Sequence, residues 1–225
     1  MAYRTARTPG VLLRSAAYRR SGAWWLRVVP TTWQQRLRLR LPGDGRRIEI
    51  GPGFAPKPGY VHVDINPRVP QLDLFSTRAL PAGWAEEVLA VHCVEHIPGP
   101  ALRATLRSWM DLLEPGGVLY LHTPNAAALG RALAGSTLEE PAYWAALSAV
   151  YGYGHAPGDC RRPEDLTGAP DHTLLFTPAS LVKVLEDVGF ERVADVSGRL
   201  PCDHRDGWEP FVPDLCLEVE AYRPA

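Results

Sequence analysis

Acidic and glycine residues with the spacing of a ligand-binding loop occur in RIEIGPGFAPKPGYVHVDI, residues 47–65. Glu49 lies in a first β-like run, and Asp64 lies near the end of a second. Gly51 and Gly53 stand between the runs, where glycine lets a backbone approach a ligand because it has no Cβ and permits positive φ. An acid that ends the second strand can accept hydrogen bonds from both hydroxyls of a ribose. The segment therefore predicts a site for a ligand that contains a nucleoside.

The acids of this region also indicate what the rest of the ligand carries. Glu49 could bind a cationic amine, and Asp73, at the end of a third β-like run, could reach an adenine amino group. A pyrophosphate pocket would not need acids at the ends of three neighbouring strands. The GPGFAP loop also lacks the glycine-to-helix geometry that binds a pyrophosphate. The pattern therefore favours a nucleoside with a cationic group over a dinucleotide.

The cysteines indicate a reduced protein without a metal. Cys160 and Cys202 could be combined with His155 and His204 into a zinc site, but their spacing matches no zinc signature, so no metal is expected. There is no signal-peptide pattern, and no apolar run approaches the roughly 20 residues that span a bilayer, which together predict a soluble, cytoplasmic protein. The four cysteines are widely spaced without a CxxC pair: Cys93, Cys160, Cys202 and Cys216.

Strand and helix signals alternate along the chain after Gly45, and the elements that they predict must position these residues. Apolar residues at helical spacing predict a helix over 99–113 that EPGG stops, and the N-cap Thr177 predicts another over 178–188. Apolar strands that alternate with helices imply a largely parallel sheet covered on both faces, with ligands beyond the carboxyl ends of its strands. Strand-like runs are found at 46–50, 60–65, 71–75, 87–92, 117–123, 190–196 and 214–222.

The chain of 225 residues predicts one domain with extensions. Residues 1–43 contain nine arginines and no Asp, Glu or Lys, and form a basic N-terminal extension. This extension could contact a membrane surface or an anionic ligand, or dock on the more acidic remainder of the chain. The domain then spans 44–225, with an insertion over about 125–175 that begins with a helical stretch at 126–150. An irregular insertion of this size is typical of a lid or a binding loop.

Five motifs occur in an order and spacing that resemble a known family. They are IEIGPG, VHVDI, LDLF, VLAVHCVEHI and LLEPGGVLYLHTPN, and DHTLLFTPASLVKVLEDVGFERV follows the insertion. Residues 46–196 thereby resemble the class I S-adenosylmethionine-dependent methyltransferases, above all the branch that modifies small molecules and glycans. The resemblance implies an α/β, Rossmann-like sheet of seven strands, mostly parallel, with helices on both faces. Because only about nine residues separate the first two strands, their crossover must be shortened to a turn around APKPG.

The resemblance also implies S-adenosylmethionine as the cofactor, whose positive sulfonium suits a rim of carboxylates. One departure from the family is that Phe54 and Ala55 stand where a further glycine often lies. Carried over by position, the cofactor residues are Glu49, Gly51, Gly53 and His92 at the methionine end, Asp64 at the ribose diol, and Asp73 and Leu74 beside the adenine.

Methyl transfer to a hydroxyl needs in-line positioning and a base that removes the hydroxyl proton. His172 is the first candidate for this base and His155 the second, because both lie with Asp171 in the insertion, where an acceptor would arrive. His172 could instead only order the loop before FTP. Glu95 and His96 form a tempting acid–base pair, although the resemblance favours a structural role for them at the rim of the cofactor site.

The predicted function is the transfer of a methyl group from S-adenosylmethionine to O or N of a small-molecule, sugar or glycan acceptor. One alternative is a nicotinamide-dependent oxidoreductase, which shares an acid at the second strand. Another is a catalytically degenerate methyltransferase fold that serves as a binding protein. Nucleic-acid bases are disfavoured as acceptors, because the chain lacks the Asn/Asp-Pro-Pro-aromatic motif that is used on their amino groups.

Overall fold

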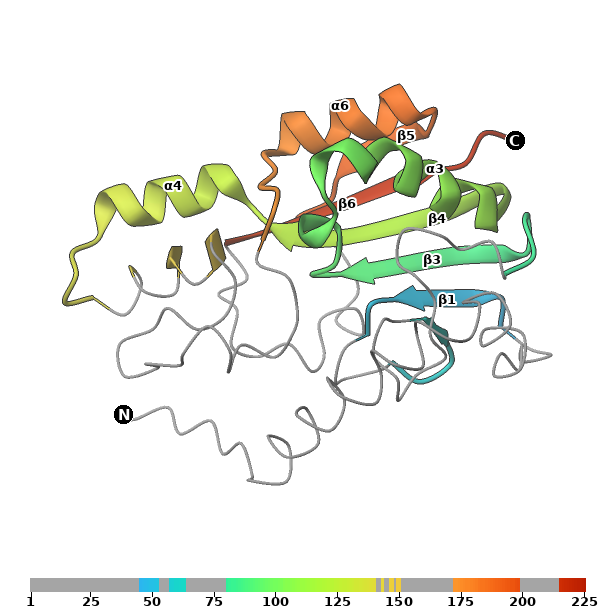
Figure 1. Cartoon of the computed structure of the whole chain (residues 1–225), viewed down its shortest axis with the longest axis horizontal. Helices are drawn as coiled ribbons and strands as arrows, with labels where there is room; N and C mark the ends of the chain where they lie inside the picture. Colours follow the sequence, from blue (N-terminus) through green and yellow to red (C-terminus); the bar gives the residue numbers. More distant parts are fainter. Residues whose placement is uncertain are drawn as a thin grey trace.

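The computed structural model describes residues 45–52, 57–63, 80–140, 143, 146–147, 149–150, 172–198 and 215–225. Its strands form one sheet in the order β2-β1-β3-β4-β6-β5 (Figure 1). β2, β1, β3 and β4 pair in parallel, and β6 runs antiparallel to its neighbours β4 and β5. The strands are β1 (Arg47–Ile50), β2 (Val61–Val63), β3 (Ala85–Val91), β4 (Leu113–Pro124), β5 (Glu191–Asp195) and β6 (Cys216–Tyr222).

This sheet confirms the predicted Rossmann-like, mostly parallel architecture. Each described strand overlaps one of the predicted strand runs, and the remaining predicted strand, 71–75, lies outside the described residues. β1 and β2 are parallel neighbours although only residues 51–60 connect them. The first crossover is therefore as short as the sequence predicts.

One face of the sheet is strongly apolar, because side chains alternate between the two faces along each strand. Helix α3 (Leu102–Leu112) and helix α6 (Pro178–Val188) lie side by side over this face (Figure 1), and their buried side chains join its core. The sequence predicts helices on both faces of the sheet, and among the described residues helices cover this face. Two rows of register partners form the face: Ile48, Val61, Val88, Leu119 and Ala221, and then Ile50, Val63, Ala90, Leu121 and Val219.

Helix α6 begins and ends where its sequence signals predict. The Thr177 side chain caps it by accepting a hydrogen bond from the Ser180 amide at 3.2 Å, and Pro178 occupies the first turn. Gly189 ends the helix with a φ of 112°, a left-handed conformation that favours glycine. Local signals at both ends were therefore sufficient to place this helix.

Helix α3 ends within one residue of its predicted end. It runs to Leu112, and the EPGG segment that follows lies at the start of β4, which begins at Leu113. Leu113 is fully buried and pairs with Ala85 of β3, and a bulge between Ala85 and Glu87 absorbs the irregular start of β4. The start of β4 is therefore fixed to the core directly after the helix ends.

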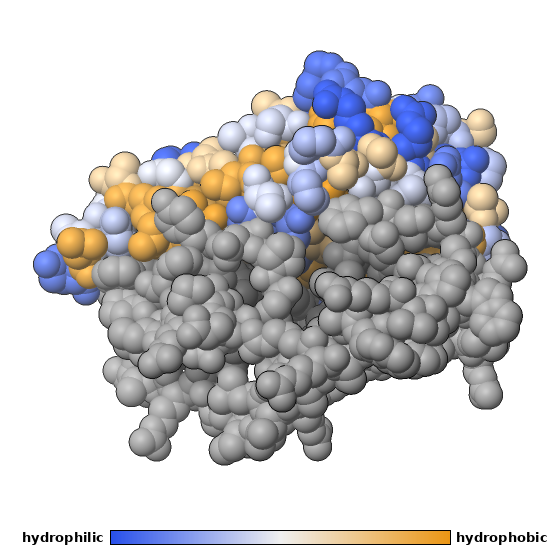
Figure 2. Space-filling view, viewed as in Figure 1, coloured by the Kyte–Doolittle hydropathy of each residue, from blue (hydrophilic) through white to orange (hydrophobic). Residues whose placement is uncertain are grey.

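The predicted helical stretch 126–150 is wrong as a single element. Helix α4 (Ala126–Gly135) is capped by the Asn125 side chain, residues 136–140 are not helical, and the next described helical residue is 143. A turn in which the Glu140 amide donates to the Thr137 carbonyl at 3.0 Å separates the two parts. Figure 2 shows apolar side chains gathered over α4 and hydrophilic ones over α6. Among the described residues, no helix has the length and apolar character needed to cross a bilayer.

The opposite face of the sheet carries polar side chains among its apolar ones. Glu49 of β1 and His62 of β2 are register partners there, and His122 of β4 pairs with Glu218 of β6. Glu49, His122 and Glu218 are all buried. Polar groups are costly to bury unless they are hydrogen-bonded, so these three side chains need partners inside the fold.

Candidate functional site

The order of the strands reverses between β1 and β3, which makes their carboxyl ends the expected place for a ligand. Gly51 follows β1 with a φ of 70°, and its amide donates to the Val63 carbonyl at 2.8 Å. Cys93 follows β3, and a Cβ added at Gly51 would lie 3.0 Å from its Sγ. The loops that follow β1 and β3 are therefore in contact at the reversal point, and only glycine fits there.

Glu49 anchors the loop that follows β1. The residue is 2% exposed, and its Oε2 accepts a hydrogen bond from the Lys57 amide at 2.8 Å. His62 Nε2 lies 3.3 Å from the same oxygen and 2.6 Å from the Lys57 carbonyl oxygen. The carboxylate thus ties the far end of the glycine loop to the first two strands.

Glu95 forms the centre of a buried polar cluster at the carboxyl ends of β3 and β4. It lies in the short helix η1 (Val94–His96), directly after β3, and is fully buried. Its Oε1 lies 3.0 Å from His92 Nδ1, and its Oε2 accepts a hydrogen bond from the Thr123 hydroxyl at 3.0 Å. Burial acts to raise the pKa of the Glu95 carboxyl, but the hydrogen bond and the charge of His92 outweigh it, so the pKa lies below its ordinary value. Glu95 is therefore an anion inside the fold.

His172 joins this cluster from the segment that precedes α6. Its Nδ1 donates to the Ala149 carbonyl at 2.8 Å, because a carbonyl oxygen can only accept. Its Nε2 lies 3.9 Å from Glu95 Oε1, and its ring meets the His96 ring edge-on at 4.8 Å between centroids. Burial lowers the pKa of His172 and the Glu95 charge only partly restores it, so the pKa lies below its ordinary value. In the neutral ring, Nε2 is the atom that can accept a proton.

Thr173 holds His172 in this position. The Thr173 amide and hydroxyl both donate to the Glu95 carbonyl, at 2.9 and 3.1 Å, and the hydroxyl also lies 2.9 Å from the Ile97 carbonyl. These bonds join the segment before α6 to the turn after β3. The hydrogen bonds of Thr173 thus hold His172 close to the Glu95 carboxylate.

The structure brings several predicted site residues to the carboxyl edge of the sheet. Gly51 and His92 lie at the ends of β1 and β3, Glu49 lies one residue before the end of β1, and His172 contacts Glu95. The other predicted residues lie outside the described residues: Gly53, Asp64, Asp73, Leu74 and His155, together with Asp171, Cys160, Cys202 and His204.

Sequence reasoning missed three members of this region. Thr123, His122 and Cys216 carry no role in the sequence prediction, yet all three lie with His92 and Glu95 at the ends of β3, β4 and β6. One signal was available for the first two. His122 and Thr123 interrupt the apolar strand LYLHTP at its carboxyl end, where ligand-binding groups are expected.

A family model described as a methyltransferase domain matches residues 32–195, which is more than two-thirds of the chain. The chain belongs to the S-adenosylmethionine-dependent methyltransferases. This membership agrees with the expected S-adenosylmethionine cofactor, and the nicotinamide-dependent alternative is set aside. A search of the curated proteins finds no match.

Solved structures of methyltransferases share this fold at low sequence identity. A chain in the complex between the Haloferax volcanii Trm112 methyltransferase activator and the protein described as its methyltransferase has a TM-score of 0.50 at 12% identity, over 95% of this chain and 98% of that one. A possible histamine N-methyltransferase from Thermotoga maritima has a TM-score of 0.49 at 14% identity, over 93% and 97%. The CurJ carbon methyltransferase has a TM-score of 0.47 at 18% identity, over 83% of this chain and 50% of that one. The chain thus spans about half the length of the CurJ and DszA carbon methyltransferases that it matches.

We expect Gly51→Ala to disturb the contact between the loops after β1 and β3, where the sequence predicts that the cofactor binds. The new Cβ combines a left-handed φ with a contact of 3.0 Å to Cys93 Sγ, so the loops after β1 and β3 must separate. Strain of this kind costs about 1–3 kcal/mol of unfolding free energy, and the displaced loop should bind S-adenosylhomocysteine more weakly. Urea unfolding and isothermal titration measure the two effects.

Gly116→Ala is the matched control for this substitution. Gly116 has a φ of 80°, and nothing lies within 4 Å of its added Cβ, so this variant loses only the conformational preference of glycine. It should lower stability by about 1–2 kcal/mol and leave cofactor affinity unchanged. If Gly51→Ala and Gly116→Ala had the same unfolding free energy and the same affinity for S-adenosylhomocysteine, the contact between the two loops would not contribute to cofactor binding.

Proposed function

We propose that S-adenosylmethionine binds where the loops after β1 and β3 meet. The described residues fit this cofactor, because Gly51 lets the two loops come into contact and Glu49 fixes the glycine loop. The buried carboxylates of Glu49 and Glu95 also suit a cofactor with a positively charged sulfur. When bound, the cofactor supplies the methyl group. In the proposed arrangement Glu49, Gly51, Gly53 and His92 surround its methionine end, Asp64 binds its ribose, and Asp73 and Leu74 flank its adenine.

For the acceptor, we propose an oxygen or nitrogen atom of a small molecule, a sugar or a glycan. The observation that carries this proposal is the contact between His172 and Glu95 beyond β3 and β4, beside the proposed cofactor site. A hydroxyl or protonated amine must lose a proton when it is methylated, and the neutral His172 can take that proton at Nε2. Glu95 then stabilises the imidazolium that forms, because its carboxylate lies 3.9 Å away.

The acceptor class can be tested with a cofactor that carries a carbon-13 methyl group. The full-length protein is incubated with pools of hydroxyl-bearing, amine-bearing and carbon-acid acceptors, and products are identified by mass spectrometry and carbon-13 NMR. The chemical shift of the transferred methyl distinguishes oxygen, nitrogen and carbon as its new partner. Methylation at oxygen or nitrogen supports the proposal, whereas methylation at carbon alone refutes it.

The proposed ribose contact gives a separate prediction. Asp64→Ala should weaken S-adenosylhomocysteine binding at least tenfold, because a charge-assisted hydrogen bond to a ribose diol contributes about 1.5–3 kcal/mol. Isothermal titration measures the affinity, and circular dichroism should stay native. A folded variant with unchanged affinity would remove Asp64 from the site.

A further inference from the structure

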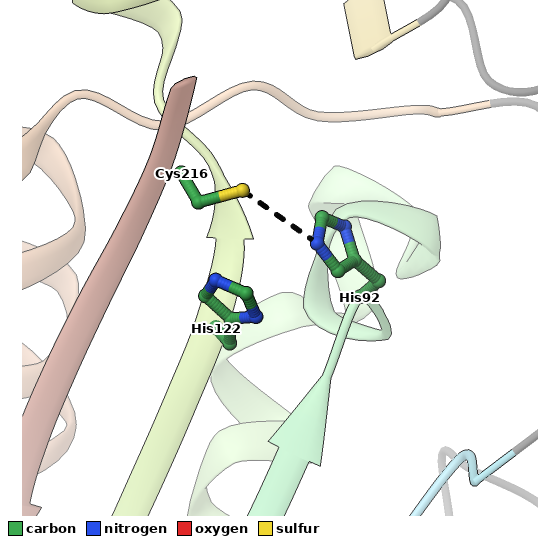
Figure 3. Close-up of side chains that lie close together, drawn as sticks. All are labelled: His92, His122 and Cys216. Atoms are coloured by element: carbon green, nitrogen blue, oxygen red, sulfur yellow. Dashed lines mark hydrogen bonds between the residues drawn. The ribbon is translucent and has the colours of Figure 1, made fainter. Parts of the chain in front are cut away.

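Three side chains with metal-binding atoms converge beyond the ends of β3, β4 and β6. Figure 3 shows His92, His122 and Cys216 pointing toward one another, each from a different strand end. Cys216 Sγ lies 3.8 Å from His92 Nε2, and the two imidazole rings meet edge-on with 4.9 Å between centroids. One ligand atom from each of the three residues lies within 4.8 Å of those of the other two. The arrangement is a compact set of two nitrogens and one sulfur.

The sheet itself holds the three residues in place. The His92 amide donates to the His122 carbonyl at 2.7 Å, which joins the end of β3 to β4. Pro124 and Cys216 are register partners, so the start of β6 is paired with the end of β4. His92 also has a φ of 48°, a conformation that non-glycine residues rarely adopt and that turns the chain out of β3 at this point. Ligands on rigid strands are already positioned before any ion arrives.

We propose that His92, His122 and Cys216 bind a divalent cation of the zinc class. Imidazole nitrogen and thiolate sulfur are the ligands that Zn²⁺ prefers, whereas Mg²⁺ and Ca²⁺ prefer oxygen. Tetrahedral Zn²⁺ with bonds of about 2.0–2.3 Å places its nitrogen and sulfur ligands roughly 3.3–3.6 Å apart. The 3.8 Å between Cys216 Sγ and His92 Nε2 is therefore within a few tenths of an ångström of the bound geometry.

One carboxylate lies behind a histidine as it does at metal-bound histidines. Glu95 Oε1 lies 3.0 Å from His92 Nδ1, so the bonded proton stays on Nδ1 and Nε2 is the ligand atom that faces Cys216. A hydrogen-bonded carboxylate of this kind orients the ring and increases its basicity toward a metal. Glu218 Oε1 lies 3.8 Å from His122 Nε2 on the neighbouring strand, which adds a negative charge near the cluster.

Binding of the cation displaces protons from its ligands. The Cys216 thiol becomes a thiolate bonded to the metal, both histidines bind as neutral imidazoles, and the thiol proton passes to solvent. The affinity for the metal should therefore rise with pH. The described residues supply three protein ligands, the number found in zinc sites that keep one position for water or a substrate atom. In this arrangement both nitrogens of His92 are engaged, so its contact with the cofactor would be made by ring carbon or backbone atoms.

The test begins with the full-length protein, loaded with Zn²⁺ and dialysed. We expect about one tightly held ion, with X-ray absorption spectra that show one sulfur at about 2.3 Å and two histidine nitrogens at about 2.0–2.1 Å. Loading with Co²⁺ should give the visible bands of a tetrahedral site together with a sulfur-to-metal charge-transfer band. Protein that retains no metal, or metal bound by oxygen alone or by two or more sulfurs, would overturn the proposal. These spectra need no variant, and they are read without an acceptor or a methyl-transfer assay.

Variants then assign the ligands. Cys216→Ala should abolish the charge-transfer band, and His122→Ala should lower the metal affinity by more than the roughly 10–100-fold that loss of an orienting carboxylate costs. Cys93→Ala is the matched control, because Cys93 is also buried but lies against Gly51 instead of in this cluster. It should retain the metal and the spectrum of the unmodified protein. Equal metal binding in Cys216→Ala and Cys93→Ala would place the ion elsewhere and refute the assignment.

Discussion

His172→Ala is expected to lower turnover by about 10²–10⁴-fold, the usual contribution of a general base. The affinity for S-adenosylhomocysteine should change little, because the ring contacts Ala149, Glu95 and His96 instead of the loop after β1. Burial lowers the pKa of His172, and only the unprotonated ring can act as a base. The rate of the unmodified enzyme should therefore rise with pH through an inflection below about 6.5, the unperturbed value for histidine, and the variant should lose that inflection.

Thr173→Val is the matched control for a histidine that only orders its segment. Thr173 holds the same segment through hydrogen bonds to Glu95 and Ile97 but cannot accept the acceptor proton. It should raise the KM for the acceptor, reduce turnover modestly and keep the inflection. Turnover against pH is measured for all three proteins. A His172→Ala enzyme that keeps the inflection of the unmodified enzyme would exclude His172 as the base.

Glu95→Ala is expected to have the largest effect on stability. The variant removes the carboxylate that accepts a hydrogen bond from the Thr123 hydroxyl and that lies close to both His92 and His172. Removing one partner from a buried charge pair lowers the unfolding free energy by about 3–5 kcal/mol. Glu95 is fully buried, so solvent water does not replace the lost contacts. Urea unfolding at neutral pH measures the loss. A loss below about 1 kcal/mol would show that the cluster contributes little to the fold.

Two controls separate the charge from the volume of this side chain. Glu95→Gln keeps the shape of the side chain and one acceptor oxygen, so it should lower the unfolding free energy less than Glu95→Ala does. Glu86→Ala removes an exposed carboxylate that lies 3.9 Å from Arg46, and it should change stability by less than about 1 kcal/mol. Because the pKa of Glu95 is lowered in the folded state, its stabilisation is complete above the unfolded-state pKa and is lost as pH falls through the folded-state pKa. The stability difference between the unmodified protein and Glu95→Gln should therefore shrink only in acid.

Local signals in the sequence determined most of the elements of this protein. Short strand-like runs located the six described strands, and their alternation with helical segments predicted the mostly parallel sheet. Thr177 and Gly189 located both ends of α6, because capping depends on residues within a turn of the helix end. The order of the motifs also led to the family. Local signals failed over 126–150, where a turn between Thr137 and Glu140 interrupts the single helix that the small residues predict.

Only the tertiary structure decided which side chains meet at the site. His92, His122 and Cys216 are separated by up to 124 positions along the chain, and no local spacing relates them. The sequence alone indicated four isolated thiols and no metal, whereas the pairing of β6 with β4 and the turn after β3 bring the Cys216 thiol close to two histidines. The sequence likewise paired Glu95 with His96 alone, whereas the fold also brings Thr123 and His172 to its carboxylate. Strand order and register are set by packing over the whole sheet, and they alone determine which distant side chains share an edge.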